Sequence, residues 1–358
     1  MPQAPPAADT ADLLDGSHFG LESRQLPVKD VLALNEEMKS WVKAKTAGSR
    51  HAGSRLRKLV EGLIDDGLLN LEYDQNLTHT AAETFMLRRG NCLSFSLLFV
   101  ALARDAGLDV SFQMVDVPPS FSATGDIVKL NNHINVLVTR IRSDTQFHQN
   151  HVVDFNTAEY SGNYDTRRVS DNYAVALYHS NVGVEKIQAG DYDEAFLYFK
   201  RGIELDPEIP GLWTNLGALY SIRGFPELAL RAYQQALVLE PAYRSALINL
   251  SKVLTDLGRL DEAEKYRMQA RFHQRLNPYF HLQQAQIAYE NSDFSATLEH
   301  LDEAIRLKGD EHLFYKLQGL THEQLGDQKS AGKSYRLAQK LAQRAGVSKI
   351  YERKLNLL

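Results

Sequence analysis

The stretch LWTNLGALY, residues 212–220, contains features that recur along the second half of this 358-residue chain. Its Gly217 belongs to a series of small residues spaced by 34 positions, and a second series at the same interval is almost entirely alanine. The first series is Gly183, Gly217, Ser251, Ala285 and Gly319, and the second is Ala195, Ala229, Ala263, Thr297 and Ala331. Small residues at a fixed interval indicate that two antiparallel helices approach closely in every repeat.

A third series at this interval marks the turn between the two helices of each repeat: Gly190, Gly224, Gly258, Ser292 and Gly326. The spacing Trp213-x2-Leu216-Gly217-x2-Tyr220 resembles the tetratricopeptide repeat, as does Ala195-x3-Phe199. We therefore predict an all-α tetratricopeptide-repeat superhelix of five repeats over residues 171–345 and a polar-faced capping helix over 346–358. The fourth repeat departs most from the pattern.

Amide side chains stand two positions before the small residues of the first series. These residues are Asn181, Asn215, Asn249 and Gln283. The row resembles the asparagine ladder of O-linked N-acetylglucosamine transferases, in which amides hold a peptide backbone, because an amide both donates and accepts hydrogen bonds. The alternative is that asparagine is simply frequent at this position of the repeat. The first interpretation predicts a bound peptide or protein partner.

Upstream of the repeats the pattern changes to that of an α+β domain, which we place at residues 27–170. Residues 1–26 are rich in Pro and Ala and are predicted to be a flexible tether. Helical spacing covers 28–46, 53–66, 80–89 and 92–106, with Thr80 and Glu83 as a capping box. Alternating β-branched and apolar residues predict strands at 69–74, 109–117, 133–141 and 151–156.

The chain contains a single cysteine, Cys92, which follows Gly90 and Asn91 at the start of an apolar helix. Only a thiolate is nucleophilic, and both a helix N-terminus and a nearby imidazolium stabilise it. His133 at the start of a strand can provide the imidazole, and Asp154 on the neighbouring strand can orient it. Asp116 and Asp126 are alternatives for the carboxylate. A small buried cysteine with a purely structural role is the alternative for Cys92.

The segments TAAETFMLRRGNCLSFSLLFVALARDAGL, HINVLV and VVDFN resemble the transglutaminase-like superfamily of papain-type cysteine enzymes. The resemblance covers about residues 55–160. It implies a papain-like α+β fold with Cys92 as the nucleophile, His133 as general base and acid, and Asp154 as the orienting residue. Leu93 departs from the family, in which an aromatic residue often follows the cysteine. Bacterial relatives with C-terminal repeats often carry a lipoprotein leader, which favours a periplasmic over a cytoplasmic location.

An acyl intermediate also needs donors for its oxyanion. The backbone amide of Cys92 is one, and Tyr73, Gln75 and Asn76 are candidates for the second. The pair His148 and His151 has no acidic or cysteine partner in its segment, so we expect no metal site and no cofactor.

Composition excludes some classes of function. The net charge of −5 provides no basic surface for nucleic acid, and no apolar run is long enough to cross a bilayer. Two hypotheses remain. The first is a cysteine-dependent acyl-transfer enzyme, a peptidase or amidase if water resolves the thioester and a transglutaminase if an amine does. The second is a catalytically silent scaffold that binds peptides along its repeats.

Overall fold

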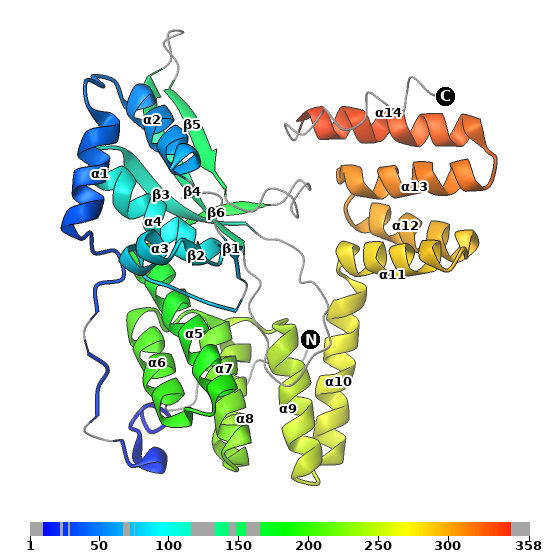
Figure 1. The fold of residues 1–358 in the computed structure, drawn as a ribbon. Helices are drawn as coiled ribbons and strands as arrows, with labels where there is room; N and C mark the ends of the chain where they lie inside the picture. Colours follow the sequence, from blue (N-terminus) through cyan, green and yellow to red (C-terminus); the bar gives the residue numbers. More distant parts are fainter. Residues whose placement is uncertain are drawn as a thin grey trace. The chain divides into compact units, whose positions relative to one another are not determined.

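The computed structural model describes residues 10–21, 24–27, 29–66, 72–74, 76–115, 133–142, 148–154 and 165–344 (Figure 1). The chain divides into two compact units. Unit 1 comprises Met1–Asn156 and Thr166–Glu264, and unit 2 comprises Thr157–Asp165 and Lys265–Leu358. The predicted repeat array is therefore shared between the units, since the division falls within one helix of the third repeat. The predicted capping helix at 346–358 lies outside the described residues.

The first half of unit 1 contains helices and strands, as the sequence predicts. Its helices are α1 (Glu36–Thr46), α2 (Ala52–Asp65), α3 (Ala81–Leu87) and α4 (Cys92–Asp105). The capping box of α3 is confirmed: Thr80 accepts a hydrogen bond from the Glu83 amide at 3.3 Å, and the Glu83 carboxylate accepts one from the Thr80 amide at 2.9 Å. α1 is shorter than predicted and begins after Asn35, whose side chain caps it.

The main sheet has four strands in the order β5-β4-β3-β6, and all neighbours are antiparallel. The strands are β3 (Asp109–Val115), β4 (His133–Arg142), β5 (His148–Val153) and β6 (Thr166–Val169). The sequence predicts the first three but not β6, because its two arginines interrupt the apolar alternation. A short parallel pair, β1 (Glu72–Tyr73) and β2 (Arg89–Gly90), lies just before α4.

Helix α4 is the centre of this half of the chain. Residues 93–103 are all buried, so the helix is enclosed on every side, as its nearly continuous apolar sequence requires. The Ser96 hydroxyl donates a hydrogen bond of 3.1 Å to the Ile134 carbonyl and so joins α4 to β4. At its other end, Arg104 forms a two-point ion pair of 2.6 and 2.8 Å with Asp171 at the start of the repeats.

The repeats form antiparallel helical hairpins. In unit 1 they are α5 (Asp171–Ala189), α6 (Tyr192–Leu205), α7 (Pro210–Ile222), α8 (Pro226–Leu239) and α9 (Arg244–Asp256). α10 (Leu260–Arg275) crosses the division. The predicted close approach is confirmed: a Cβ built on Gly183 would lie 2.5 Å from the Phe199 ring, and one on Gly217 would lie 2.7 Å from the Tyr233 ring.

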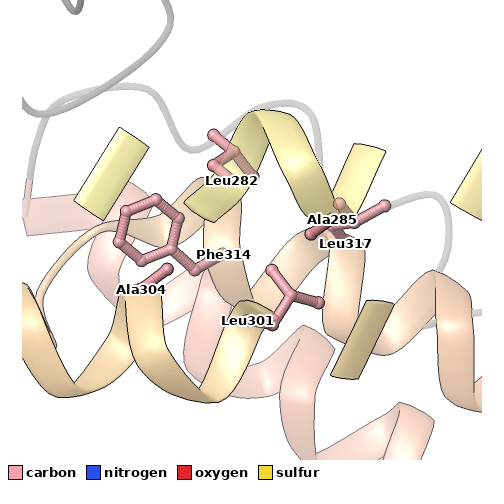
Figure 2. Close-up of a cluster of buried hydrophobic side chains, with 6 residues drawn as sticks. All are labelled: Leu282, Ala285, Leu301, Ala304, Phe314 and Leu317. Atoms are coloured by element: carbon pink, nitrogen blue, oxygen red, sulfur yellow. The ribbon is translucent and has the colours of Figure 1, made fainter. Parts of the chain in front are cut away.

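Unit 2 continues the hairpins with α11 (Pro278–Glu290), α12 (Phe294–Leu307), α13 (His312–Gln324) and α14 (Gln328–Arg344). Its core is a cluster of buried apolar side chains contributed by α11, α12 and α13 (Figure 2). The cluster contains Leu282, Ala285, Leu301, Ala304, Phe314 and Leu317. The small Ala285 and Ala304 let the helices approach, and Phe314, which is fully buried, fills the space between them.

The N-terminal segment predicted to be a flexible tether is packed over residues 10–21. Leu13 is 0% exposed and Leu21 is 6% exposed, and a short 3-10 helix spans Ser17–Phe19. The prediction rested on the Pro/Ala-rich composition of residues 1–9, which the structure does not describe. It overlooked the apolar side chains that follow, which bury against the repeats.

Candidate functional site

Cys92 is the first residue of α4, as predicted, and its side chain is half-buried. Asn91 caps the helix by accepting a 3.0 Å hydrogen bond from the Ser94 amide, and its own amide donates to Thr78 at 2.8 Å. Gly90 has a φ of 156°, and a Cβ there would lie 2.7 Å from the Ser94 Cβ. Only glycine fits this turn, so the local sequence directs the sulfur to the N-terminus of a helix, where the backbone dipoles favour an anion.

His133 is the first residue of β4, and its side chain is 1% exposed. The ring nitrogen Nε2 lies 2.6 Å from Asp154 Oδ2. Cys92 also lies near the ring and contributes to raising its pKa. The structure therefore brings together the three residues that the sequence singled out, although 41 residues separate Cys92 from His133 and 21 separate His133 from Asp154.

Asp154 follows directly after β5, at the point where the strand register places it beside β4. Val153 pairs with Val136, so the next residue along β5 faces Asn135. The Asn135 amide donates a 3.1 Å hydrogen bond to Asp154 Oδ2, the same oxygen that holds His133. Asn135 is 4% exposed and was not predicted from the sequence. The signal was available, because residues two apart on a strand point to the same face.

The protonation of His133 reflects these contacts. Burial lowers the pKa of the ring, but the hydrogen bond to Asp154, the charge of that carboxylate and the neighbouring Cys92 outweigh burial and raise the pKa to about 9. At neutral pH the ring is therefore an imidazolium ion held between a carboxylate and a sulfur. An imidazolium beside a cysteine is the arrangement in which the sulfur can act as a nucleophile and the ring as an acid.

The predicted oxyanion donors fall in and around β1. Tyr73 pairs with Gly90, and the Asp74 amide donates a 3.1 Å hydrogen bond to the Gly90 carbonyl, so this segment runs directly beside the entry to α4. Asn76 is exposed, and its backbone amide donates to Asp74 Oδ1 at 2.8 Å. Gln75 lies outside the described residues. The segment is thus near enough to α4 to supply a donor, and the oxyanion role of Tyr73 and Asn76 stays a prediction.

No group of three His, Cys, Asp or Glu side chains suited to a metal ion occurs in the described ranges. His148 and His151 both belong to β5, which begins three residues before the predicted strand at 151–156. Among the same ranges, no helix has the length and apolar character needed to cross a membrane.

Two of the four residues of the amide row, Asn215 and Asn249, are buried. Asn215 is 2% exposed and donates a 3.1 Å hydrogen bond to Ser180 Oγ, and Asn249 is 7% exposed. Asn181 is partly exposed in unit 1, and Gln283 is partly exposed in unit 2. A peptide reaching Asn215 would have to replace a bond that the repeats already make.

A different surface of the repeats is open and apolar. Met268 and Phe272 on α10 are 55% and 61% exposed, and Leu276 just beyond the helix is 49% exposed. Their spacing of four residues places them on one face, which we call the α10 row. Large apolar side chains grouped in this way on a surface indicate a contact site for another molecule.

Comparisons with known proteins agree with the repeat assignment. Models of the tetratricopeptide repeat match residues 178–209, 214–270 and 282–346. These matches lie outside the α+β half, and no transglutaminase-like domain is detected. The papain-like fold predicted for residues 27–170 is therefore not established by similarity.

Among curated proteins, the chain is 32% identical over 97 residues to the STIP1 homolog of Dictyostelium discoideum. That match covers 27% of this chain and 17% of the relative, so the chain spans well under two thirds of the relative's length.

Among solved structures, a crystal structure of MamA is 18% identical over 49% of this chain and 96% of that one, with a TM-score of 0.27. The second tetratricopeptide domain of Spaghetti (RPAP3), bound to an HSP90 peptide, is 26% identical over 27% of this chain and 90% of that one, with a TM-score of 0.26. The matches to the family models show that the C-terminal part of the chain consists of tetratricopeptide repeats.

Proposed function

We propose that this chain is a protein-interaction scaffold whose repeats bind a peptide segment of a partner protein. The observation that carries the proposal is the α10 row, Met268, Phe272 and Leu276. These three large apolar side chains are about half exposed, and they lie on or just after a helix rich in charged residues. Tetratricopeptide repeats are built to present such surfaces, because each hairpin contacts only its neighbours and leaves long faces open. An apolar stripe with four-residue spacing suits a helical or extended apolar peptide.

Selection from a phage-displayed library of random peptides tests this function on the intact chain. We expect enriched apolar sequences that bind the wild type and lose about tenfold or more in affinity for a Met268→Asp, Phe272→Asp variant, because charge on the row opposes burial of the peptide. Leu325→Asp is the matched control, since Leu325 is 53% exposed but belongs to the α13–α14 turn. Selected peptides that bind the Met268→Asp, Phe272→Asp variant as tightly as the wild type would contradict the proposal.

The contacts of Cys92 favour a second candidate function, cysteine-dependent acyl transfer. The support is that Cys92 lies near His133 and raises its pKa, while His133 Nε2 lies 2.6 Å from Asp154 Oδ2. In this function the sulfur of Cys92 attacks a carbonyl carbon and forms a thioester. His133 gives its proton to the leaving group, and water or an amine then releases the acyl group. The repeats would hold the substrate near the sulfur and raise its local concentration.

Release of p-nitrophenol from p-nitrophenyl acetate tests the second candidate without a known substrate. We expect an initial burst near one equivalent per chain that is absent in Cys92→Ala and at least about a hundredfold slower in His133→Ala, as for loss of a general acid and base. His151→Ala is the matched control, because this exposed histidine lies on the neighbouring strand β5. A burst that persists in Cys92→Ala, or one that is absent in the wild type, would leave only the scaffold.

A further inference from the structure

The N-terminal segment, residues 10–21, is seated on the edge of the first two repeats like a bound peptide. Asp12 forms a two-point ion pair with Arg231 of α8, at 2.5 and 2.7 Å. The next residue, Leu13, is 0% exposed, and its carbonyl accepts a 2.7 Å hydrogen bond from the Tyr220 hydroxyl of α7. Both contacts lie within unit 1.

The other end of the segment is held by aromatic rings. The Phe19 ring stacks on Phe196 of α6 with centroids 4.8 Å apart, and the Arg223 guanidinium lies 5.6 Å from the Phe19 centroid. His18 packs against Phe225 with centroids 5.3 Å apart. Three helices thus form one surface, which we call the edge site: Phe196, Tyr220, Arg223, Phe225 and Arg231.

The segment is shaped by its own short-range contacts before it meets the edge site. Gly16 has a φ of 80°, and a Cβ there would lie 3.3 Å from Phe196 and 3.1 Å from the Leu21 backbone. Asp15 accepts hydrogen bonds of 2.8 Å from both the amide and the hydroxyl of Ser17 and so closes the following turn. A peptide that forms this turn by itself presents Asp12, Leu13 and Phe19 in the order in which the edge site contacts them.

The contacts are of the kinds that recognise a separate peptide. A carboxylate meets a guanidinium at two points, a backbone carbonyl meets a hydroxyl, and an aromatic ring enters an aromatic pocket. Asp12 and Arg231 have side chains 48% and 32% exposed, so water reaches the pair and can replace it. The segment is therefore held in a way that another chain can imitate and displace.

We propose that the edge site binds partner segments that carry an Asp-Leu pair followed six residues later by Phe, and that the chain's own N-terminal segment occupies the site until such a partner displaces it. The charge of Arg231 and the stacked ring of Phe196 select this chemistry. The inference rests on the proposed function of the repeats, because it names one surface and one ligand class for partner binding.

The test uses a fluorescent synthetic peptide of residues 9–21 and the full-length chain. A Leu13→Asp, Phe19→Ala variant unseats the internal segment, and we expect it to bind the peptide at least about tenfold more tightly than the wild type, whose site is occupied. Adding Arg231→Glu to this variant should abolish binding, and a peptide with Asp12→Arg should restore it. Arg201→Glu, at an arginine of α6 whose side chain is 43% exposed, is the control and should have no effect.

The proposal would be overturned if the peptide bound the wild type and the Leu13→Asp, Phe19→Ala variant equally tightly. It would also be overturned if adding Arg231→Glu left binding unchanged. If the double variant fails to fold, Asp12→Arg alone replaces it, since this side chain is half exposed and the same direction is expected. A dimer of the wild type that dissociates on Arg231→Glu would assign the site to a second copy and also overturn the proposal. Peptides selected by the α10 row are unaffected by any of these results, so failure here is distinguishable from failure of the proposed function.

Discussion

At the scale of single residues, the contact between His133 and Asp154 makes stability depend on pH. The pKa of His133 is raised to about 9 in the folded chain, whereas an unfolded histidine titrates near 6.5. Below pH 6.5 the ring is protonated in both states and the contact contributes fully. As the pH rises through 9 the folded ring also loses its proton, and the contribution disappears.

We therefore predict that Asp154→Asn lowers the free energy of unfolding by on the order of 2–3 kcal/mol at pH 6 and by much less at pH 9.5. Urea unfolding at the two pH values measures the difference. Asp171→Asn is the control, because its partner Arg104 keeps its charge across this range and the loss should not change with pH. A loss for Asp154→Asn that is constant from pH 6 to 9.5 would argue against the assigned contact.

The three residues of this site were predictable because chain order and strand pairing both constrain them. A cysteine that begins a helix, a histidine that begins a strand and an aspartate directly after the next strand can meet only if the two strands pair. Asn135 was not predicted, although it faces Asp154 across the same pair of strands. Its position two residues after His133 places it on the same face of β4, but the hydrogen bond that it donates to Asp154 Oδ2 is visible only in the structure.

At the scale of secondary-structure elements, the repeats depend on glycine wherever an aromatic ring crosses a helix. We predict that Gly217→Ala destabilises unit 1 by about 1–3 kcal/mol, since the new Cβ would lie 2.7 Å from the buried Tyr233 ring. Gly332→Ala in α14 is the matched substitution. Its nearest neighbour is the flexible end of Arg336 at 3.4 Å, so it should stabilise by about 0.5–1 kcal/mol. Urea midpoints of both variants check the opposite signs.

The turns of the hairpins give a second prediction at this scale. Gly190, Gly224, Gly258 and Gly326 all have positive φ between 75° and 82°, and Ser292 occupies the same position of the fourth repeat with φ of 61°. Ser292→Gly should raise the free energy of unfolding of unit 2 by about 1 kcal/mol, because a residue with a Cβ is strained in this conformation. An unchanged or lower thermal midpoint for unit 2 would contradict this explanation of the turn.

The elements themselves were largely predictable from the sequence. The 34-residue spacing of small residues predicted the helical hairpins. The alternation of β-branched and apolar residues predicted β3, β4 and β5. β6 was missed because its TRRV sequence has arginines where a strand prediction needs apolar residues, and its pairing with β3 compensates for this through backbone hydrogen bonds. The packing of residues 10–21 was not predicted because the Pro/Ala-rich composition describes the segment as a whole. It does not show that one leucine, Leu13, is buried and holds the segment in place.

At the scale of the whole molecule, the division into two units predicts two steps of unfolding. Phe314 is fully buried in the unit 2 cluster (Figure 2), so Phe314→Ala should cost about 3–5 kcal/mol and lower only the transition that belongs to unit 2. Hydrogen exchange followed by mass spectrometry assigns each step to its helices. Phe272→Ala, at a residue 61% exposed, should change neither step. One cooperative transition that shifts as a whole in Phe314→Ala would contradict the division.

The whole molecule thus joins a partly buried Cys-His-Asp arrangement to repeats that offer an open apolar row and an occupied edge site. The sequence predicted both the Cys-His-Asp arrangement and the repeats. It did not predict that the amides Asn215 and Asn249 are covered while Met268 and Phe272 are open, because exposure depends on how hairpins stack and not on spacing alone.

The most direct measurement of partner binding is photo-cross-linking of this protein in its native cells. A photoreactive p-benzoylphenylalanine in place of Phe272 should give a discrete adduct with another protein on illumination. The same group in place of Glu299, an exposed residue of α12, should not. The adduct should disappear when Met268→Asp is added. An absence of adducts at position 272, or equal adducts at both positions, would contradict a scaffold that binds partners through its repeats.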